Sequence, residues 1–381
     1  MDLAFTPEQQ MIADVIDAFA REVLLPRYAH WDRTGNLPEE QFARMGEIGL
    51  LGLRVPEAFG GQDVDAVTAG LAIEAAARGD FNCCYAILIA CFAGEILGRH
   101  GDDAVKAEWL PGMASGEKII CTCLTEPQGG SDAAGIRTRA VRQGDDYVIS
   151  GEKASITLVM AGHAGIVFAK TDPAAGAKGV TAFLVPFDLP GVSRAPYADL
   201  GSRGIARGSL FFDEVRIPAR YRIGAEGAAF SKVMHTFDYT RALIGLMCLG
   251  AAQQSLAETV EYLKSRQSFG QPLPRYQGVS FPVAEWAAKI EMARWLCLRT
   301  LWLRDQNLPH TAEAAMCKMQ CPDIAVGAIH ECLLLHGHYG YTQDFPHEQR
   351  LRDVIGQQIA DGTTQIQKLI VARELFGRDF V

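Results

Sequence analysis

The residues with the clearest capacity for chemistry lie in a few short stretches of the chain. In the first of these, Leu124 to Asp132 read LTEPQGGSD, with two adjacent glycines between hydroxyl and carboxyl side chains. Because glycine has no Cβ, Gly129 and Gly130 would let backbone amides approach a planar ligand closely. The same composition is also typical of a simple β-turn. Taken alone, the stretch does not decide between a ligand site and a loop.

A second stretch places an acid and a base on one face of an expected helix. Asp238 and Arg241 are about one helical turn apart, and the residues that follow, 243–247, are apolar or glycine. An exposed ion pair at such spacing contributes only about 0.3–0.5 kcal/mol. A charged pair in a buried helix needs a ligand or a partner, so we interpret this pair as part of a binding site.

Histidines and cysteines do not form a metal-binding pattern. His336 and His338 make one HxH without acidic or cysteine neighbours, and we interpret it as structural. The ten cysteines are scattered and form no CxxC motif. We therefore expect no metal site, and we expect reduced, buried thiols in a cytoplasmic protein.

Composition excludes several functional classes. The chain has 381 residues, 49% of them hydrophobic, and a formal net charge of -9, so a nucleic-acid partner is not expected. The first ten residues, MDLAFTPEQQ, contain no basic segment followed by an apolar run, so we expect no signal peptide. The longest apolar stretch, 85–94, is too short to cross a bilayer, and we expect no membrane insertion.

The elements that position these residues follow a helical, β, helical order. Thr6 to Gln9 form a capping box with proline at the first helical position. Helices are then expected over 66–78, 83–99, 243–264, 283–305, 313–335 and 364–375. Short runs rich in β-branched residues predict strands over 147–150, 166–169, 180–185 and 209–217. We expect a helical domain over 1–118, a β-sheet domain over 119–228 and a helical bundle domain over 229–381.

Seven collinear motifs resemble those of the acyl-CoA dehydrogenase family of flavoproteins, over essentially the whole chain. Besides the Thr125–Asp132 segment, they are Gly151-Glu152-Lys153, Ile156-Thr157, Phe237 to Arg241, Arg266-x-x-Phe269-Gly270, Arg352-Asp353 and Asp361 to Gln367. The resemblance implies an α+β fold with an N-terminal helical domain, a central β domain and a C-terminal four-helix bundle. It also implies a homotetramer that passes electrons to an electron-transferring flavoprotein.

The resemblance implies an FAD site shared between subunits. Within one subunit it assigns Thr122, Cys123, Leu124, Thr125, Ser131, Ser155, Thr157, Thr363 and Gln365 to the cofactor. For the FAD of a neighbouring subunit it assigns Arg266 and Gln277. It also assigns Phe269, Leu334, Gly337 and His338 to the cofactor. A guanidinium suits the pyrophosphate because it donates two charge-assisted hydrogen bonds. A solvated arginine at a helix end is the alternative for Arg266.

The resemblance also assigns the acyl-CoA contacts, to Ser131, Asp238, Arg241 and Gly362. Dehydrogenation at Cα–Cβ needs a base for the α proton and an acceptor, flavin N5, for the β hydride. The family usually places the base glutamate just before the Gly-Thr of the last motif, where this chain has Asp361. Other members place the glutamate at a second position, which Thr240 occupies in this chain. We therefore expect Asp361 to be the base, although a helix-capping aspartate that serves Thr364 is also possible.

Two departures from the family bear on the substrate. The first is Asp361: aspartate is one methylene shorter than glutamate, so its oxygens stop about 1.5 Å short of where those of glutamate would lie. The second is Ala360, which stands where the family often has a bulky aromatic residue. Both favour a ring or branched acyl group such as cyclohexane-1-carboxyl-CoA, whose dehydrogenases also carry aspartate here. Ser155 replaces a tryptophan that stacks on the flavin in many members, which puts the usual contact with the electron acceptor in doubt.

Three alternatives stay open at this stage. A nitroalkane-oxidase-like flavoenzyme would use Asp361 to deprotonate a small nitro compound, but it needs no CoA channel. A short- or branched-chain acyl-CoA dehydrogenase would differ only in the acyl group. A flavin-binding protein that has lost catalysis would have no need of Asp361.

Overall fold

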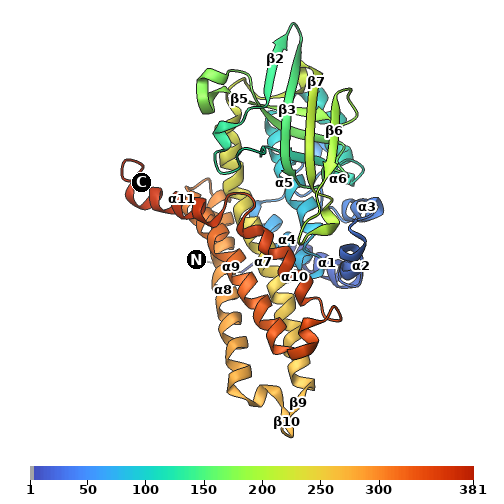
Figure 1. Cartoon of the computed structure of the whole chain (residues 1–381), viewed down its shortest axis with the longest axis vertical. Helices are drawn as coiled ribbons and strands as arrows, with labels where there is room; N and C mark the ends of the chain where they lie inside the picture. Colours follow the sequence, from blue (N-terminus) through green and yellow to red (C-terminus); the bar gives the residue numbers. More distant parts are fainter. Residues whose placement is uncertain (1–3) are drawn as a thin grey trace.

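The computed structural model describes residues 4–381, with the backbone alone over 230–234. The chain is helical from residue 7 to 115, forms a sheet between 120 and 223, and is helical again from 229. The sheet lies at one end of the molecule, and the long C-terminal helices extend to the other end (Figure 1). The helical, β, helical architecture expected from the sequence is confirmed.

The N-terminal helices begin with the expected capping box. Thr6 Oγ1 accepts a hydrogen bond from the Gln9 amide, and the Gln9 side chain accepts one from the Thr6 amide, both 3.1 Å. The helices are α1 (Pro7–Phe19), α2 (Tyr28–Thr34), α3 (Glu39–Glu47), α4 (Ala66–Gly79), α5 (Cys83–His100) and α6 (Asp103–Ser115). Helix α4 packs closely on the C-terminal bundle, where a Cβ on Gly250 would lie 2.5 Å from the Glu74 carbonyl oxygen. Only glycine fits there.

Helix α5 is longer than its apolar run in the sequence. By length and composition alone this 18-residue helix could cross a membrane, but 83% of it is buried inside the structure. Packing against its neighbours on nearly all sides accounts for its apolar composition. The helix itself agrees with the one expected over 83–99, since it ends one residue later.

The central domain is an eight-stranded sheet with the order β6-β7-β3-β2-β4-β5-β8, and β1 pairs in parallel with β4. Its strands are β1 (Ile120–Cys123), β2 (Arg139–Gln143), β3 (Asp146–Ile156), β4 (Ala164–Lys170), β5 (Val180–Pro186), β6 (Val192–Pro196), β7 (Gly208–Pro218) and β8 (Arg222–Ile223). Every residue of β4 and β5 is buried. These two antiparallel strands therefore form the centre of the domain, and most of their residues are apolar.

Three long helices form the C-terminal bundle: α7 (Ala229–Ser265), α8 (Gln277–Asp305) and α9 (Thr311–Leu335). A small hairpin, β9 (Gln267–Ser268) and β10 (Gln271–Pro272), joins α7 to α8 at the end farthest from the sheet (Figure 1). After the turn Gly337–Tyr341, α10 (His347–Ile355) packs on α9. The last helix, α11 (Thr364–Phe376), contacts α9 and then projects away from the body (Figure 1).

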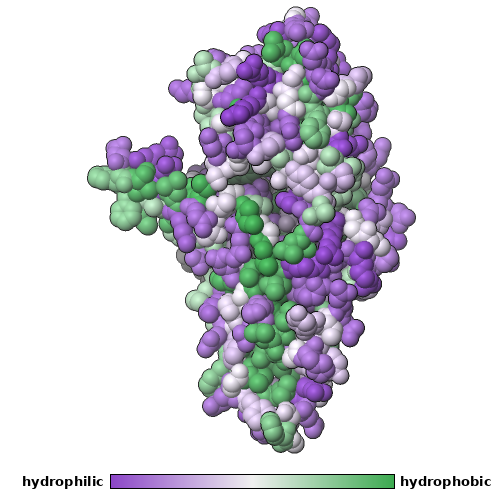
Figure 2. All heavy atoms as spheres, viewed as in Figure 1, coloured by the Kyte–Doolittle hydropathy of each residue, from purple (hydrophilic) through white to green (hydrophobic). Residues whose placement is uncertain are grey.

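Apolar side chains remain exposed on this domain. Figure 2 shows a band of apolar residues along the bundle and another on the projecting α11. Leu334 on α9 and Leu375 and Phe376 on α11 are each more than half exposed, at 54%, 69% and 66%. Contiguous apolar surface of this kind marks a site of association.

Candidate active site

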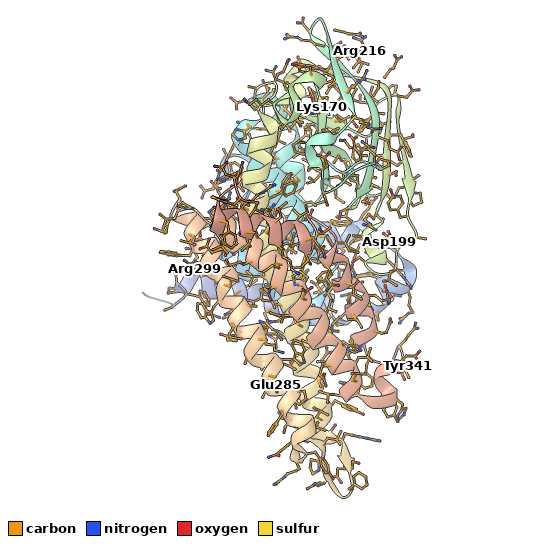
Figure 3. All side chains as sticks on the ribbon, turned by 60° about the vertical axis from the view of Figure 1, so that its left-hand side comes forward. Lys170, Asp199, Arg216, Glu285, Arg299 and Tyr341 are labelled. Carbon is orange, nitrogen blue, oxygen red and sulfur yellow. The ribbon has the colours of Figure 1, made fainter. Side chains whose placement is uncertain are left out.

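A cleft with a volume of about 710 Å³ opens where the three domains meet. Helix α5 contributes Tyr85, Leu88, Ile89 and Phe92 to its wall, and α7 contributes Phe237, Thr240 and Arg241. The segment 199–207 closes one side, and Figure 3 shows Asp199 at the junction between the sheet and the helices. Residues from 352 to 366 complete the lining.

The β-domain wall of the cleft is rich in hydroxyl groups. The side chains that line it include Thr122, Thr125, Ser131, Ser155 and Thr157, from the ends of β1 and β3 and the loop after β1. Leu124 lies among them, whereas the Cys123 side chain is buried on the other face of β1 and does not line the cleft. A row of hydrogen-bonding groups beside apolar α5 suits a flat ligand with one polar edge.

The two glycines of the LTEPQGGSD stretch are not required by packing within the chain. A Cβ on Gly130 would meet only the Thr125 Cγ2, at 3.7 Å, which is an ordinary contact. Gly130 lines the cleft, so its bare backbone faces the space that a ligand would fill. The residues present therefore fit a closely held planar cofactor such as a flavin.

A buried ion pair supports this loop from beneath. Glu126 accepts hydrogen bonds from Lys153 Nζ at 2.7 Å and from the amides of Arg137 and Thr138 at 2.6 and 3.0 Å. Lys153 also donates to the Leu124 carbonyl at 3.0 Å. Burial raises the pKa of the Glu126 carboxyl, but Lys153 and the other donors outweigh burial and lower this pKa to about 2. The sequence motifs included both residues, but their pairing was not foreseen.

Asp361 lies in the same cleft, on the turn before α11. Its backbone has φ +50°, a left-handed conformation that aspartate tolerates better than most residues. The N-cap of α11 is Thr363, whose hydroxyl accepts from the Ile366 amide at 3.3 Å, so the helix-capping alternative for Asp361 is not realised. The Asp361 carboxylate forms no hydrogen bond with the other described residues.

The electrostatic surroundings of Asp361 combine two opposing effects. Its side chain is exposed to the cleft. The protein around the carboxyl group still removes part of its solvation, which raises its pKa above the ordinary aspartate value. The positive charges of Lys318 and Arg241 lower the pKa and only partly compensate. A carboxylate with a raised pKa is a stronger proton acceptor than an ordinary one.

Arg241 reaches the cleft while Asp238 stays behind it. The two side chains form a buried ion pair, and Asp238 also accepts a hydrogen bond of 2.8 Å from Thr311. Burial lowers the pKa of Arg241, whereas Asp238 and Asp361 raise it. Arg241 lines the cleft, so its charge faces whatever occupies the space beside Asp361, and Asp238 orients it from behind.

Several predicted cofactor residues lie far from this cleft in the same chain. Arg266, Phe269, Gln277, Leu334, Gly337 and His338 are exposed near the end of the bundle that carries the β9–β10 hairpin. Phe269 is 96% exposed, and Gln365, on α11, is exposed as well. A single chain therefore brings together Thr122, Leu124, Thr125, Ser131, Ser155, Thr157, Arg241, Asp361, Gly362 and Thr363, but not this second group.

The two histidines of the HxH do not face one another. His336 is buried and stacks on Tyr262 with ring centroids 4.1 Å apart, and its Nδ1 lies 2.8 Å from the Cys332 carbonyl. His338 is exposed. Among the described residues, no group of three or more His, Cys, Asp or Glu side chains is arranged to hold a metal.

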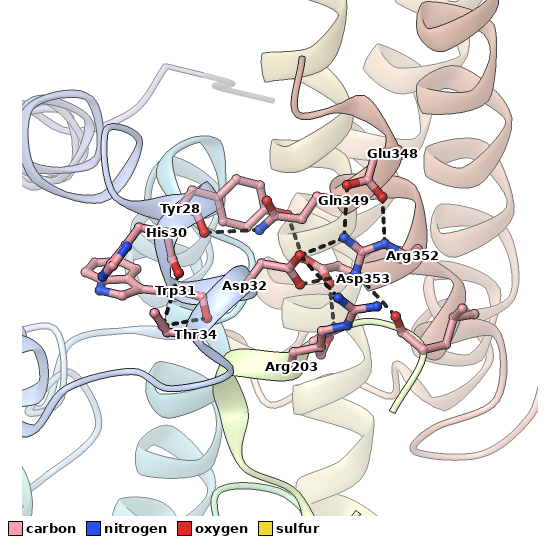
Figure 4. A network of polar contacts seen from close by, with 12 residues as sticks. Tyr28, His30, Trp31, Asp32, Thr34, Arg203, Glu348, Gln349, Arg352 and Asp353 are labelled. Carbon is pink, nitrogen blue, oxygen red and sulfur yellow. Dashed lines mark hydrogen bonds and ion pairs between the residues drawn. The ribbon is translucent and has the colours of Figure 1, made fainter. Parts of the chain in front are cut away.

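The Arg352-Asp353 motif proves to be a junction between domains. Arg352 pairs with Asp32 and Glu348, each with a closest approach of 2.7 Å, and Asp32 comes from the N-terminal helix α2 (Figure 4). Asp353 accepts hydrogen bonds from Tyr28, from Asn82 and from the Ser202 amide. These contacts hold α10, and with it the segment that carries Asp361, against the other two domains.

Comparisons with known proteins agree with this geometry. The N-terminal, middle and C-terminal domain models of acyl-CoA dehydrogenases match residues 6–117, 121–215 and 228–376. A probable acyl-CoA dehydrogenase of Bacillus subtilis, YngJ, is 35% identical, with 98% of this chain and 100% of the relative covered.

Two solved structures are similar over nearly their whole length. The butyryl-CoA dehydrogenase of Megasphaera elsdenii matches with a TM-score of 0.95 and 30% identity, over 98% of this chain and 100% of that one. A glutaryl-CoA dehydrogenase of Mycobacterium smegmatis in complex with FADH2 matches with a TM-score of 0.93 and 29% identity, over 98% and 96%.

Proposed function

This chain belongs to the acyl-CoA dehydrogenase family, and on that premise we propose that it oxidises a ring or branched acyl-CoA with Asp361 as the base. Members of the family are FAD-dependent oxidoreductases. When bound, FAD supplies the acceptor for the hydride that leaves the β carbon. The chain's own residues have to bind the thioester, orient it and remove the α proton.

The observation that carries the proposal is one cleft lined both by Asp361 and by the hydroxyl-rich wall around Gly130. A thioester between the two would present its α carbon to the carboxylate, and the positive charge of Arg241 beside it would favour negative charge that develops as the proton leaves. The proton would move to a carboxylate oxygen of Asp361, whose raised pKa suits this transfer.

The shape of the cleft supports a compact acyl group. Ala360 lines it next to Asp361 and leaves room beside the α carbon, while the bulky side chains of Tyr85, Leu88 and Phe92 on α5 also line it. Wide space near the base together with a bulky wall favours a ring or a short branched chain over a long straight one, and cyclohexane-1-carboxyl-CoA fits this description. A short straight-chain substrate is the second candidate, because the Megasphaera elsdenii relative is named a butyryl-CoA dehydrogenase.

The assembly and the partners form the remaining part of the proposal. The exposed apolar surface of α9 and α11 supports a homotetramer in which Arg266, Phe269, Gln277, Leu334, Gly337 and His338 serve the FAD of a neighbouring subunit. In one chain these residues could not reach their own cleft. We further propose a cytoplasmic location, an electron-transferring flavoprotein as the acceptor, and domains bounded at 118/119 and 228/229.

Anaerobic mixing tests the proposal directly. The FAD-loaded protein is mixed with cyclohexane-1-carboxyl-CoA, isobutyryl-CoA, butyryl-CoA or nitroethane, and bleaching of the flavin absorbance is followed. We expect the cyclic thioester to bleach the flavin fastest and nitroethane not to bleach it. Faster bleaching by butyryl-CoA would favour the short-chain alternative, and bleaching by nitroethane alone would reject acyl-CoA oxidation.

The role of Asp361 is tested in the same assay with Asp361→Asn. This variant keeps the size of the side chain but cannot accept a proton, so we expect normal FAD content and bleaching slower by at least about a hundredfold. Unchanged bleaching would reject the assignment of the base.

A further inference from the structure

Lys318 is a buried cation beneath the turn that carries Asp361. It lies on α9, and its side chain is fully inaccessible to solvent. Its Nζ donates hydrogen bonds to the Gln357 carbonyl and, at 3.5 Å, to the Gly362 carbonyl. These two carbonyls lie four residues before and one residue after Asp361, so a single ammonium group joins both sides of the turn.

The turn has an unusual backbone that needs such support. Asp361 and Gly362 have consecutive left-handed φ values of +50° and +90°. The φ of Gly362 is one that residues with a side chain rarely adopt, and a Cβ there would also lie 2.5 Å from Gln367 Nε2 and displace that amide. Gln367 Nε2 in turn donates to the Gly362 carbonyl at 3.0 Å, which therefore receives hydrogen bonds from two buried side chains. Strained backbone at a functional position persists only where its surroundings hold it.

Lys318 has no carboxylate within ion-pair distance among the described residues, which is rare for a buried lysine. Burial lowers its pKa, and its acidic neighbours Asp361, Cys248 and Asp323 raise it, against the opposing charge of Arg241. Asp361 is the largest of these charged influences. Asp323 is engaged by Gln358 Nε2 at 2.7 Å. The lysine charge therefore acts mainly on Asp361.

We propose that Lys318 is a positioning residue for the Asp361 base: it fixes the turn through the carbonyls of Gln357 and Gly362, and its charge keeps the Asp361 carboxylate ionised. The residue touches neither substrate nor cofactor and acts only through Asp361. The inference rests on the proposed function of Asp361 as the base.

Two variants of Lys318, one without the charge and one with it, test this role through the pH profile of the reaction. Lys318→Gln keeps a hydrogen-bond donor and removes the charge, whereas Lys318→Arg keeps the charge. Flavin bleaching by cyclohexane-1-carboxyl-CoA and by butyryl-CoA is measured anaerobically from acid to alkaline pH. Without the charge of Lys318, the Asp361 carboxyl ionises at higher pH, so we expect the acid limb of the Lys318→Gln profile to move up by about one pH unit or more.

A matched control separates this effect from loss of stability. Arg294 is another cation of low exposure, paired with Glu74 at 2.7 Å in the contact between α4 and α8, and it does not line the cleft. Arg294→Gln should lower the melting temperature but leave the pH profile in place. Lys318→Arg should lie closer to the original profile than Lys318→Gln does. An acid limb that does not move in Lys318→Gln would overturn the inference.

Two further measurements cover the remaining outcomes. Hydrogen–deuterium exchange of the amides of 356–363 should be faster in Lys318→Gln than in Arg294→Gln, which reports on the turn without any turnover. If Lys318→Gln does not fold, Lys318→Met, of similar length and apolar, takes its place. Asp361→Asn is run alongside: if it still bleaches, the proposed function fails, whereas inactive Asp361→Asn with an unmoved Lys318 profile rejects only the inference.

Discussion

Tyr28 donates a hydrogen bond of 2.5 Å to Asp353, 325 residues later in the chain, and so joins the first helical domain to the helix that precedes the proposed base. Asp353 also accepts from Asn82 at 3.2 Å and from the backbone amide of Ser202, so all three domains meet at one buried carboxylate. Because Asp353 lines the cleft, the domain junction and the candidate active site share a wall. The packing of the domains therefore fixes the geometry of the site.

A second buried carboxylate, Asp80, lies close enough to interact with Asp353, and the pair predicts a dependence of stability on pH. Burial, with the charge of Asp353, raises the pKa of Asp80 to about 8. Burial likewise raises the pKa of Asp353 to about 6. The unfolded value is about 3.9, so the folded protein binds more protons than the unfolded chain between roughly pH 4 and 8. Stability should therefore fall as pH rises through this window.

Asp80→Asn should flatten this dependence. The amide keeps an acceptor oxygen for the backbone amides of Asn82 and Cys83 and cannot ionise. The free energy of unfolding, measured with urea at several pH values, should exceed that of the unaltered protein near pH 8 by at least about 1–3 kcal/mol and approach it only near pH 4. Asp188→Asn, on an exposed loop, controls for the change in net charge. A lower stability at pH 8 would contradict the assignment of Asp80 as a destabilising ion.

Periodicity located the large elements because burial determines which residues occupy them. The runs at 166–169 and 180–185 lie within β4 and β5, whose residues are all buried. Helices α2, α3, α6 and α10 were among the elements missed, as were β1, β2, β6 and β8. All of these except α6 have at most nine residues, and several carry mostly polar side chains, so no apolar period could identify them. Helix α6 has 13 residues but contains Pro111 and several polar residues, which obscure its period. Tertiary contacts such as the Arg352–Asp32 pair stabilise them instead.

At the site, the resemblance identified residues that line the cleft but not those that support them from behind. Thr125, Ser131 and Asp361 stand in recognisable motifs. Lys318 stands in none, because its function depends on carbonyls 39 and 44 residues away. Tyr85 and Phe92 belong to an apolar helix whose pattern indicates only burial. Which of its faces meets the cleft is decided by the packing of α5 against the other domains.

The buried pair of Glu126 and Lys153 predicts a strong effect on the β-domain loop. Since the folded pKa of Glu126 is about 2, its contribution is present above the unfolded value of about 4.3 and is lost as pH falls toward 2. Glu126→Gln leaves the Lys153 ammonium buried without a carboxylate and should cost about 3–5 kcal/mol. Thermal unfolding and the temperature of flavin release would measure this cost.

The double variant Glu126→Gln/Lys153→Met provides the control. If the two residues act as a pair, the double variant should lose less stability than the two single variants added together. Strict additivity would show that the ion pair is not the source of the effect.

Ala360 predicts which acyl groups the cleft admits. Ala360→Tyr would fill the space beside Asp361, and overpacking of about 1–3 kcal/mol should slow bleaching by cyclohexane-1-carboxyl-CoA by about tenfold or more. Butyryl-CoA is slimmer at the α carbon and should lose less rate, which makes it the internal control. Equal losses with both thioesters would show that residue 360 does not set acyl width.

The proposed sharing of FAD between subunits predicts that two inactive variants can restore one another. Asp361→Asn disables the cleft but leaves Arg266 intact, whereas Arg266→Glu keeps the cleft and should weaken FAD retention in its neighbour. In mixed oligomers, a cleft from the Arg266→Glu chain meets an intact Arg266 from the other chain. Random mixing across a two-fold interface should therefore restore about a quarter of the sites. Flavin content and bleaching rate of the co-expressed mixture would show this recovery.

Arg275→Glu, an exposed charge reversal close by in the segment between α7 and α8, is the control and should retain FAD on its own. If the mixture stays inactive while Arg266→Glu alone lacks FAD, Arg266 serves its own chain or acts only through folding.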